Sequence, residues 1–152
     1  TMSCDAAASA ALMWFAATTP MAPAPALQLT VAQAPSSVAH EPLFADIVQR
    51  AKRLKVEVDA FRGNDRPIPE AFGKKVSELS DLDMKGHLTL AQRGTDGDLK
   101  CILRGISQDL PLKLAAVTEA KDRKARDLAL RDMAYLLNDN VEVITAPPAP
   151  AV

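Results

Sequence analysis

The sequence predicts an all-α protein: a four-helix bundle with its third helix kinked at Pro111, flanked by an Ala/Pro-rich leader and tail. Only 4% of the 152 residues are aromatic, so aliphatic side chains must build the core, which favours helices packed on helices over a sheet sandwich. Apolar residues recur every three or four positions between residues 41 and 137, the spacing of a helix face. No segment is a convincing strand, and four helices joined by short turns within about 100 residues most simply form a bundle.

The first helix is expected to begin near Pro42, because proline suits the first turn of a helix. The residues that follow at helical spacing form one apolar stripe: Phe44, Ile47, Ala51, Leu54, Val58 and Phe61. The run Gly63-Asn64-Asp65 is a stop signal, and Pro67 and Pro69 favour an extended connection.

The second helix is expected to begin around Pro69. Its stripe consists of Phe72, Val76, Leu79 and Leu90. Gly86 lies on the same side, where it would admit a close neighbour. The run Ser80–Asp83 resembles a capping box, so a break there is the alternative to a continuous helix. In a continuous helix, Asp83 faces the core beside His87, four residues on.

The capping pattern Thr95-Asp96-Gly97-Asp98 predicts the start of the third helix. Its stripe consists of Leu99, Ile102, Leu103, Ile106 and Leu110. Pro111 has no backbone donor and crowds the preceding turn, so we expect the helix to kink or restart there. Leu114 and Val117 carry the apolar face onward.

The fourth helix is expected to follow a polar turn at residues 118–124 and to run from about Ala125 to Leu137. Its inward residues are predicted to be Leu128, Ala129, Met133 and Leu136. Asn138-Asp139-Asn140 is a plausible stop, and residues 141–144 are predicted to form a short extended piece.

The beginning of the chain resembles an export signal. The apolar stretch 6–17 has the length of a signal-peptide core and is too short to cross a bilayer interior of about 30 Å. Ala24-Pro25-Ala26 offers the small residues that a signal peptidase reads. The first residues, TMSCD, lack the positive charge of a typical signal. The alternatives are a true start upstream, a poor signal, or a low-complexity Ala/Pro arm.

This organisation predicts a periplasmic or secreted protein with no transmembrane segment after processing. Linker-like and tail-like composition flanks the helical part. The expected divisions are a signal peptide or arm at 1–26, a linker at 27–40, the bundle at 41–143 and a Pro/Ala tail at 144–152.

Charge and motifs exclude several functional classes. The net charge is −1 and both signs are mixed along the helical part, so nothing favours nucleic acid as a partner. The six glycines are scattered and form no phosphate-binding loop, and no GxSxG motif is present. We therefore expect a protein that is not an enzyme.

Cys101 lies about 200° around its helix from Leu99, opposite the apolar stripe. Its face also holds Arg104. A nearby cation and the helix N-terminus would lower the pKa of the thiol, whereas Asp98 would raise it, so a reactive thiol is one interpretation. The other is a small apolar filler covered by another helix or a partner subunit. A dimer bridge, or a bridge to Cys4 if the leader is retained, also remains open.

The sharpest chemical constellation is Asp83, His87 and Asp132, all expected to face inward. Helix bundles hold metals with carboxylates and histidines that project from facing helices. These residues are too few for a di-iron site, so a single transition metal completed by water is the metal hypothesis. Haem held by His87 and Met133, or by Met84 and Met133, is a related hypothesis. The alternative is an Asp83–His87 ion pair with Asp132 paired to an arginine.

These patterns favour a small exported helical-bundle protein that acts by protein–protein binding or self-association and needs no cofactor. The stripe of the first helix and the Cys101/Arg104 surface are the expected contact surfaces. The alternative is a haem- or metal-binding four-helix bundle for electron transfer or metal handling.

Overall fold

The computed structural model describes residues 38–94 and 97–146. A short 3-10 helix, η1 (Val38–His40), is followed by the four main helices α1 (Pro42–Phe61), α2 (Glu70–Arg93), α3 (Gly97–Thr118) and α4 (Arg123–Thr145). Several sequence predictions fall outside the described residues: the leader at 1–26, the linker up to residue 37, the cap residues 95–96 and the tail from residue 147.

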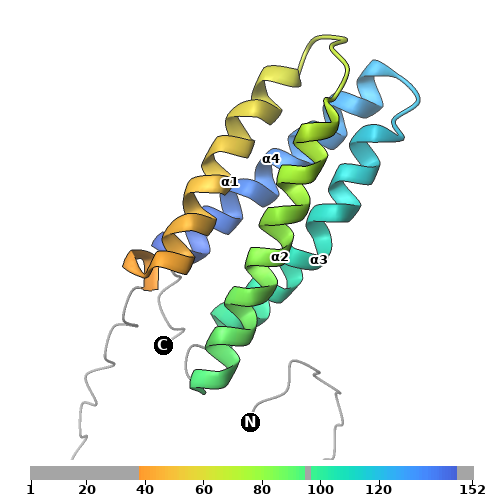
Figure 1. Ribbon diagram of the computed structural model, residues 1–152. Helices are drawn as coiled ribbons and strands as arrows, with labels where there is room; N and C mark the ends of the chain where they lie inside the picture. Colours follow the sequence, from red (N-terminus) through yellow and green to blue (C-terminus); the bar gives the residue numbers. More distant parts are fainter. Residues whose placement is uncertain (1–37, 95–96, 147–152) are drawn as a thin grey trace, which may run out of the picture. The chain divides into compact units, whose positions relative to one another are not determined.

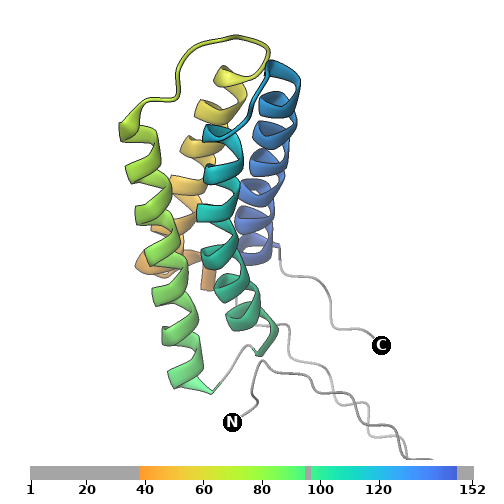
Figure 2. The same cartoon turned by 90° about the vertical axis from the view of Figure 1, so that its right-hand side faces the viewer.

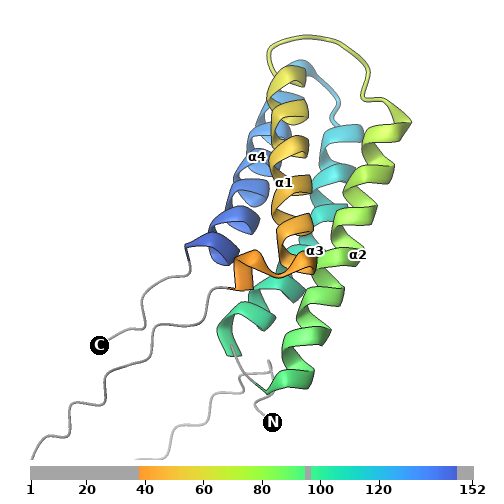
Figure 3. The ribbon, with the colours of Figure 1, turned by 60° about the vertical axis from the view of Figure 1, so that its left-hand side comes forward.

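The four helices form an up-and-down bundle in which each runs antiparallel to the next (Figure 1). α1 packs on α2 and α4, and α3 packs on the same two helices. Figure 2 shows α3 in front with α2 and α4 beside it, and Figure 3 shows α1 in front between α4 and α2. α2 and α4 therefore lie on one diagonal of the bundle. The predicted all-α four-helix bundle is confirmed.

α1 has the bounds and the buried face that its sequence predicts. Pro42 occupies its first turn, and the predicted stripe is buried except for Phe61, which is partly buried. The Phe61 ring meets Phe72 of α2 edge-on, with 5.4 Å between the ring centroids. Gly63 follows the helix with a φ of 70°, a left-handed conformation that glycine adopts without strain. Val38 of η1 is also buried, so the core extends into the predicted linker.

α2 is continuous through the possible break at Ser80–Asp83. Its buried face extends on both sides of that run, so a break would divide one packed surface into two. The predicted close approach at Gly86 is confirmed. A Cβ atom there would lie 3.1 Å from Leu103 Cδ1 and 3.3 Å from Phe44 Cε1. The missing side chain lets α1 and α3 approach α2 at this level.

α3 continues through Pro111 as one helix and does not restart. In a regular helix the N–H of residue 111 would donate to the carbonyl of Ser107, and proline has no N–H. The Ser80 hydroxyl of α2 donates to this carbonyl instead, at 2.6 Å. The neighbouring helix therefore supplies the hydrogen bond that Pro111 cannot make.

Replacing Ser80 by alanine should lower the free energy of unfolding by about 1–2 kcal/mol, because the Ser107 carbonyl then loses its donor. Urea unfolding followed by circular dichroism measures the change. In a Pro111→Ala background the backbone N–H is restored, so Ser80→Ala should cost much less there. An equal cost in both backgrounds would show that the hydroxyl does not compensate for the proline.

α4 is longer than predicted at both ends. Asp122 caps its start, its Oδ1 accepting from the Ala125 N–H at 2.7 Å. The helix passes through Asn138–Asn140 to Thr145, so the predicted stop and the extended piece at 141–144 are wrong. The reason is an apolar face that continues at helical spacing past residue 137, and its burial outweighs the weak helix propensity of Asn and Asp.

The inward face of α4 is also rotated from the predicted one. Its buried residues are Leu130, Met133, Ala134, Leu137, Asn140 and Ile144. Leu128, predicted to point inward, is 49% exposed. Leu136 is partly buried and packs against the same core as Phe44, Leu54 and Leu103, which are buried.

Candidate functional site

The core contains a polar pair, Asp83 on α2 and Asn140 on α4. Both residues are 0% exposed. Asn140 Nδ2 donates to Asp83 Oδ2 at 2.8 Å. Because α2 and α4 are diagonal helices, this hydrogen bond crosses the centre of the bundle. Among the described residues the other buried polar side chain is Ser107, whose hydroxyl donates to a carbonyl of its own helix.

Each member of the pair keeps one oxygen without a hydrogen-bond partner, Asp83 Oδ1 and Asn140 Oδ1. Buried polar atoms are normally paired, and leaving one unpaired costs about 1–3 kcal/mol. An amide oxygen only accepts, and so does an ionised carboxylate. Each of these oxygens therefore needs a hydrogen from a donor group, and a proton on the Asp83 carboxyl group is one such donor.

Burial raises the pKa of Asp83 from 3.8 to about 8, and the hydrogen bond from Asn140 offsets only part of this shift. The physical cause is the cost of holding a charge away from water. At neutral pH Asp83 is therefore mainly a neutral acid. Because it is 0% exposed, it cannot act as a general acid or base on a substrate in the closed bundle.

His87 does not pair with Asp83. Its ring lies partly buried where α2 meets α3, with Nδ1 2.7 Å from the Lys100 carbonyl oxygen. Because a carbonyl oxygen only accepts, Nδ1 carries the hydrogen and donates it. The partner of Asp83 is Asn140, so the ion pair considered from the sequence is not formed.

The remaining predicted ligands lie elsewhere. Asp132 is bonded to its neighbour Arg131 at 3.1 Å on α4, and Met133 is fully buried in the apolar core. Within residues 38–94 and 97–146, no group of three or more His, Cys, Asp or Glu side chains could hold a metal ion. Asp83, His87 and Asp132 are therefore not brought together as one metal-binding group, and haem ligation by His87 and Met133 stays a prediction.

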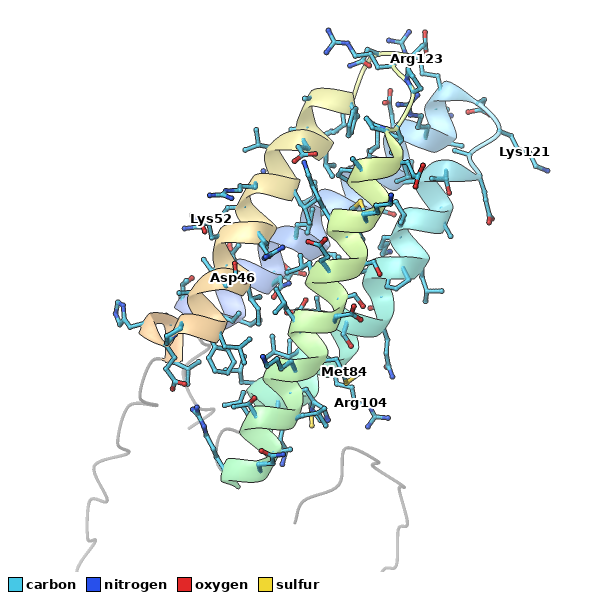
Figure 4. All side chains as sticks on the ribbon, in the orientation of Figure 1. Asp46, Lys52, Met84, Arg104, Lys121 and Arg123 are labelled. Atoms are coloured by element: carbon cyan, nitrogen blue, oxygen red, sulfur yellow. The ribbon has the colours of Figure 1, made fainter. Side chains whose placement is uncertain are left out.

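Cys101 lies off the apolar stripe of α3 and is partly buried. It is disulfide-bonded, so the free reactive thiol considered from the sequence is not its state in this structure. The other cysteine in the sequence, Cys4, lies outside the described residues. Arg104 is partly buried, and Figure 4 shows its side chain extending outward from α3.

A cleft of about 300 Å³ lies between α1 and α2. Charged side chains and one leucine line it: Asp46, Arg50, Arg53, Leu54, Glu57, Lys75 and Glu78. Two ion pairs cross it, Arg50–Glu78 at 2.8 Å and Lys75–Glu57 at 2.7 Å. Ligand pockets are mainly apolar with a few converging polar groups, so this balanced, largely paired lining makes the cleft a weak candidate.

The outer faces of the helices carry several exposed apolar side chains: Val56, Leu88, Leu112, Leu128 and Tyr135. Leu128 and Tyr135 are seven residues apart, so they lie on one face of α4. The stripe of α1, expected to be a contact surface, is used for the core instead and is not available to a partner.

No protein-family model, curated protein or solved structure matches this chain. None of the helices that the structure describes has both the length and the hydropathy needed to span a bilayer.

Asn140 is the site residue that sequence reasoning missed. From the sequence alone it is predicted to belong to a helix stop at residues 138–140. Its spacing from Met133, Leu137 and Ile144 is the helical pattern that places it on the inward face. The helical spacing that continues past residue 137 is the sequence signal that identifies Asn140.

Proposed function

We propose that this chain is an exported, non-enzymatic helical bundle that acts by binding another protein or a second copy of itself. The observation that carries the proposal is the outer face of α4, where Leu128 and Tyr135 are 49% and 64% exposed. Tyrosine is enriched at protein interfaces because it buries a large ring and still keeps a polar tip. The core side chains are buried and cannot contact a partner, so binding must use side chains on the outer surfaces.

Export is supported by the signal-like leader at residues 1–26. N-terminal sequencing of protein from the native host tests export, since a mature start at Leu27 is expected. Recovery of a chain that begins before residue 26 from the cytosol would contradict it.

A second surface that supports binding is the outer face of α3 around Cys101 and Arg104. Leu112, eleven residues after Cys101, lies on the same side of the helix and is 65% exposed. Sizing of the wild type and of Leu112→Ser tests whether this face sustains a dimer. A dimer that dissociates in Leu112→Ser supports a contact between copies through this face, and a wild-type monomer or a dimer that Leu112→Ser leaves unchanged contradicts it.

The α4 surface is tested by placing a photo-crosslinking amino acid at position 135. We expect crosslinks from this position, either to a second copy or to a partner protein in the native extracellular fraction. Position 56 on α1, also apolar and 69% exposed, serves as the matched control. Equal yields at both positions, or none at either, would contradict a contact surface on α4.

If the crosslinked species is a dimer, sedimentation should show weaker self-association when the surface is made polar. The combined Leu128→Ser and Tyr135→Ser variant should lose at least about tenfold in affinity, since a central aromatic contact is commonly worth more than 1 kcal/mol. Val56→Ser should leave the affinity unchanged.

The haem- or metal-binding alternative gains no support from the described residues, because Asp83 bonds to Asn140, His87 to the Lys100 carbonyl and Asp132 to Arg131. Absorbance spectroscopy and metal analysis of the purified protein test it directly. A Soret band or stoichiometric metal would overturn the proposal of a cofactor-free binding protein.

A further inference from the structure

The pairing of Asp83 with Asn140 has the form of an incomplete acid–amide pair. A carboxamide that faces a protonated carboxyl group can make two hydrogen bonds, one from the amide N–H and one from the carboxyl O–H. The first is present, at 2.8 Å. The two oxygens needed for the second, Asp83 Oδ1 and Asn140 Oδ1, are buried and have no other partner.

No charged group faces Asp83 from the helices packed around it. In the described part of the chain, the buried polar side chains besides Asp83 are Ser107 and Asn140, which do not titrate. On α2 itself Asp81 and Lys85 are exposed, and His87 bonds to the Lys100 carbonyl. Burial and the Asn140 hydrogen bond are accordingly the influences on the Asp83 carboxyl group.

We propose that Asp83 and Asn140 form a proton-binding site in the bundle core, in which a proton on Asp83 Oδ1 is donated to Asn140 Oδ1 and holds α2 to α4. The proton comes from solvent, and its release leaves a carboxylate oxygen beside the Asn140 oxygen with no hydrogen between them. Water must then reach the carboxylate, so proton release favours states in which the core opens. The closed bundle is the proton-bound form, and it is favoured as the surroundings become more acidic.

The test is a pH titration of the full chain labelled with ¹³C at the aspartate carboxyl carbon. Spectra linked to the backbone assign the Asp83 signal, and Asp83→Asn confirms the assignment by removing it. We expect a protonated signal at neutral pH that changes with a midpoint near pH 8. Asp81→Asn, which removes an exposed carboxyl group from the same helix, should leave this titration unchanged.

An exchange of the two side chains tests whether the proton belongs to the pair. In the double variant Asp83→Asn/Asn140→Asp, the acid–amide pair is rebuilt with its carboxyl group on α4. That group should also remain protonated at neutral pH, because it has the same amide partner and the same apolar surroundings.

An Asp83 signal that is already ionised at pH 6 would overturn the proposal. A buried water that donates hydrogen bonds to Asp83 Oδ1 and Asn140 Oδ1 would give this result, because it would stabilise the carboxylate. An ionised carboxyl group at position 140 in the exchanged variant would overturn it too. The wild-type titration decides the question alone if either variant fails to fold.

Discussion

The free energy of unfolding should fall by roughly 5 kcal/mol as the pH rises from about 4 to about 8, through Asp83 alone. In the folded protein the pKa of this carboxyl group is raised to about 8, whereas in the unfolded chain it returns to its ordinary value of 3.8. Below about pH 4 both states hold the proton, and the stabilisation is fully present.

The stabilisation by Asp83 is lost between pH 3.8 and about pH 8, the pKa values of its carboxyl group in the unfolded and folded states. There the unfolded chain gives up the proton and the folded bundle keeps it, so each pH unit costs about 1.4 kcal/mol. Above about pH 8 both states are ionised and the contribution stays lost. The predicted dependence is therefore a decline with rising pH that levels off near pH 8.

Urea unfolding of the wild type and of Asp83→Asn across this range measures the effect as a difference. The difference is needed because Glu41, whose pKa is lowered by its hydrogen bond to Arg93, acts in the opposite direction: its contribution is lost as the pH falls. An asparagine at position 83 cannot ionise and can complete the pair with Asn140, so the variant should become the more stable protein as the pH rises. Parallel profiles for the two proteins would refute the prediction.

Phe44→Ala should lower the free energy of unfolding by about 3–5 kcal/mol, because Phe44 is 0% exposed and its removal leaves a cavity. The cavity would open beside Gly86, whose missing side chain leaves room for Phe44, Ile47 and Leu103. Chemical denaturation measures the loss. Val56→Ala on the exposed face of α1 is the control and should change stability by less than about 0.5 kcal/mol.

The same site offers a coupled test. A methyl group at position 86 would lie 3.1–3.4 Å from Leu103, Phe44 and Ile47, so Gly86→Ala is expected to be strained in the wild type. In the Phe44→Ala background one of these neighbours is gone, and the same change should cost less. A coupling energy of about 0.5–3 kcal/mol is expected for residues in contact, and strict additivity would show that Phe44 does not limit the space at Gly86.

The sequence predicts most of the fold because apolar residues recur at regular helical spacing on the faces that pack in the core. α1 agrees with its prediction in bounds and face, since its stripe is bracketed by a proline and a glycine. α4 shows the limit of this reasoning. Three consecutive residues with weak helix propensity look like an end, but burial of Ile144 beyond them outweighs that propensity.

Hydrogen bonds between helices explain the features of Pro111 and Asp83 that local sequence patterns do not predict. Pro111 disturbs a helix by itself, and nothing near it in sequence reveals that Ser80 of another helix supplies the missing bond. Asp83 is predicted to face the core, but its partner is 57 residues away in the chain. The predicted partner, His87, is one turn further along α2, and its ring bonds to α3.

The hydrogen bond from Asn140 to Asp83 has one more consequence, for how far each helix can slide along its own axis. A shift of α4 by one turn, about 5.4 Å, would bring Leu137 or Ile144 opposite Asp83 and separate the two polar groups. Aliphatic layers alone resist such sliding weakly, because one branched side chain replaces another at small cost. The buried amide and acid thus select a single longitudinal alignment of α2 and α4, much as a lone asparagine sets the register of a coiled coil.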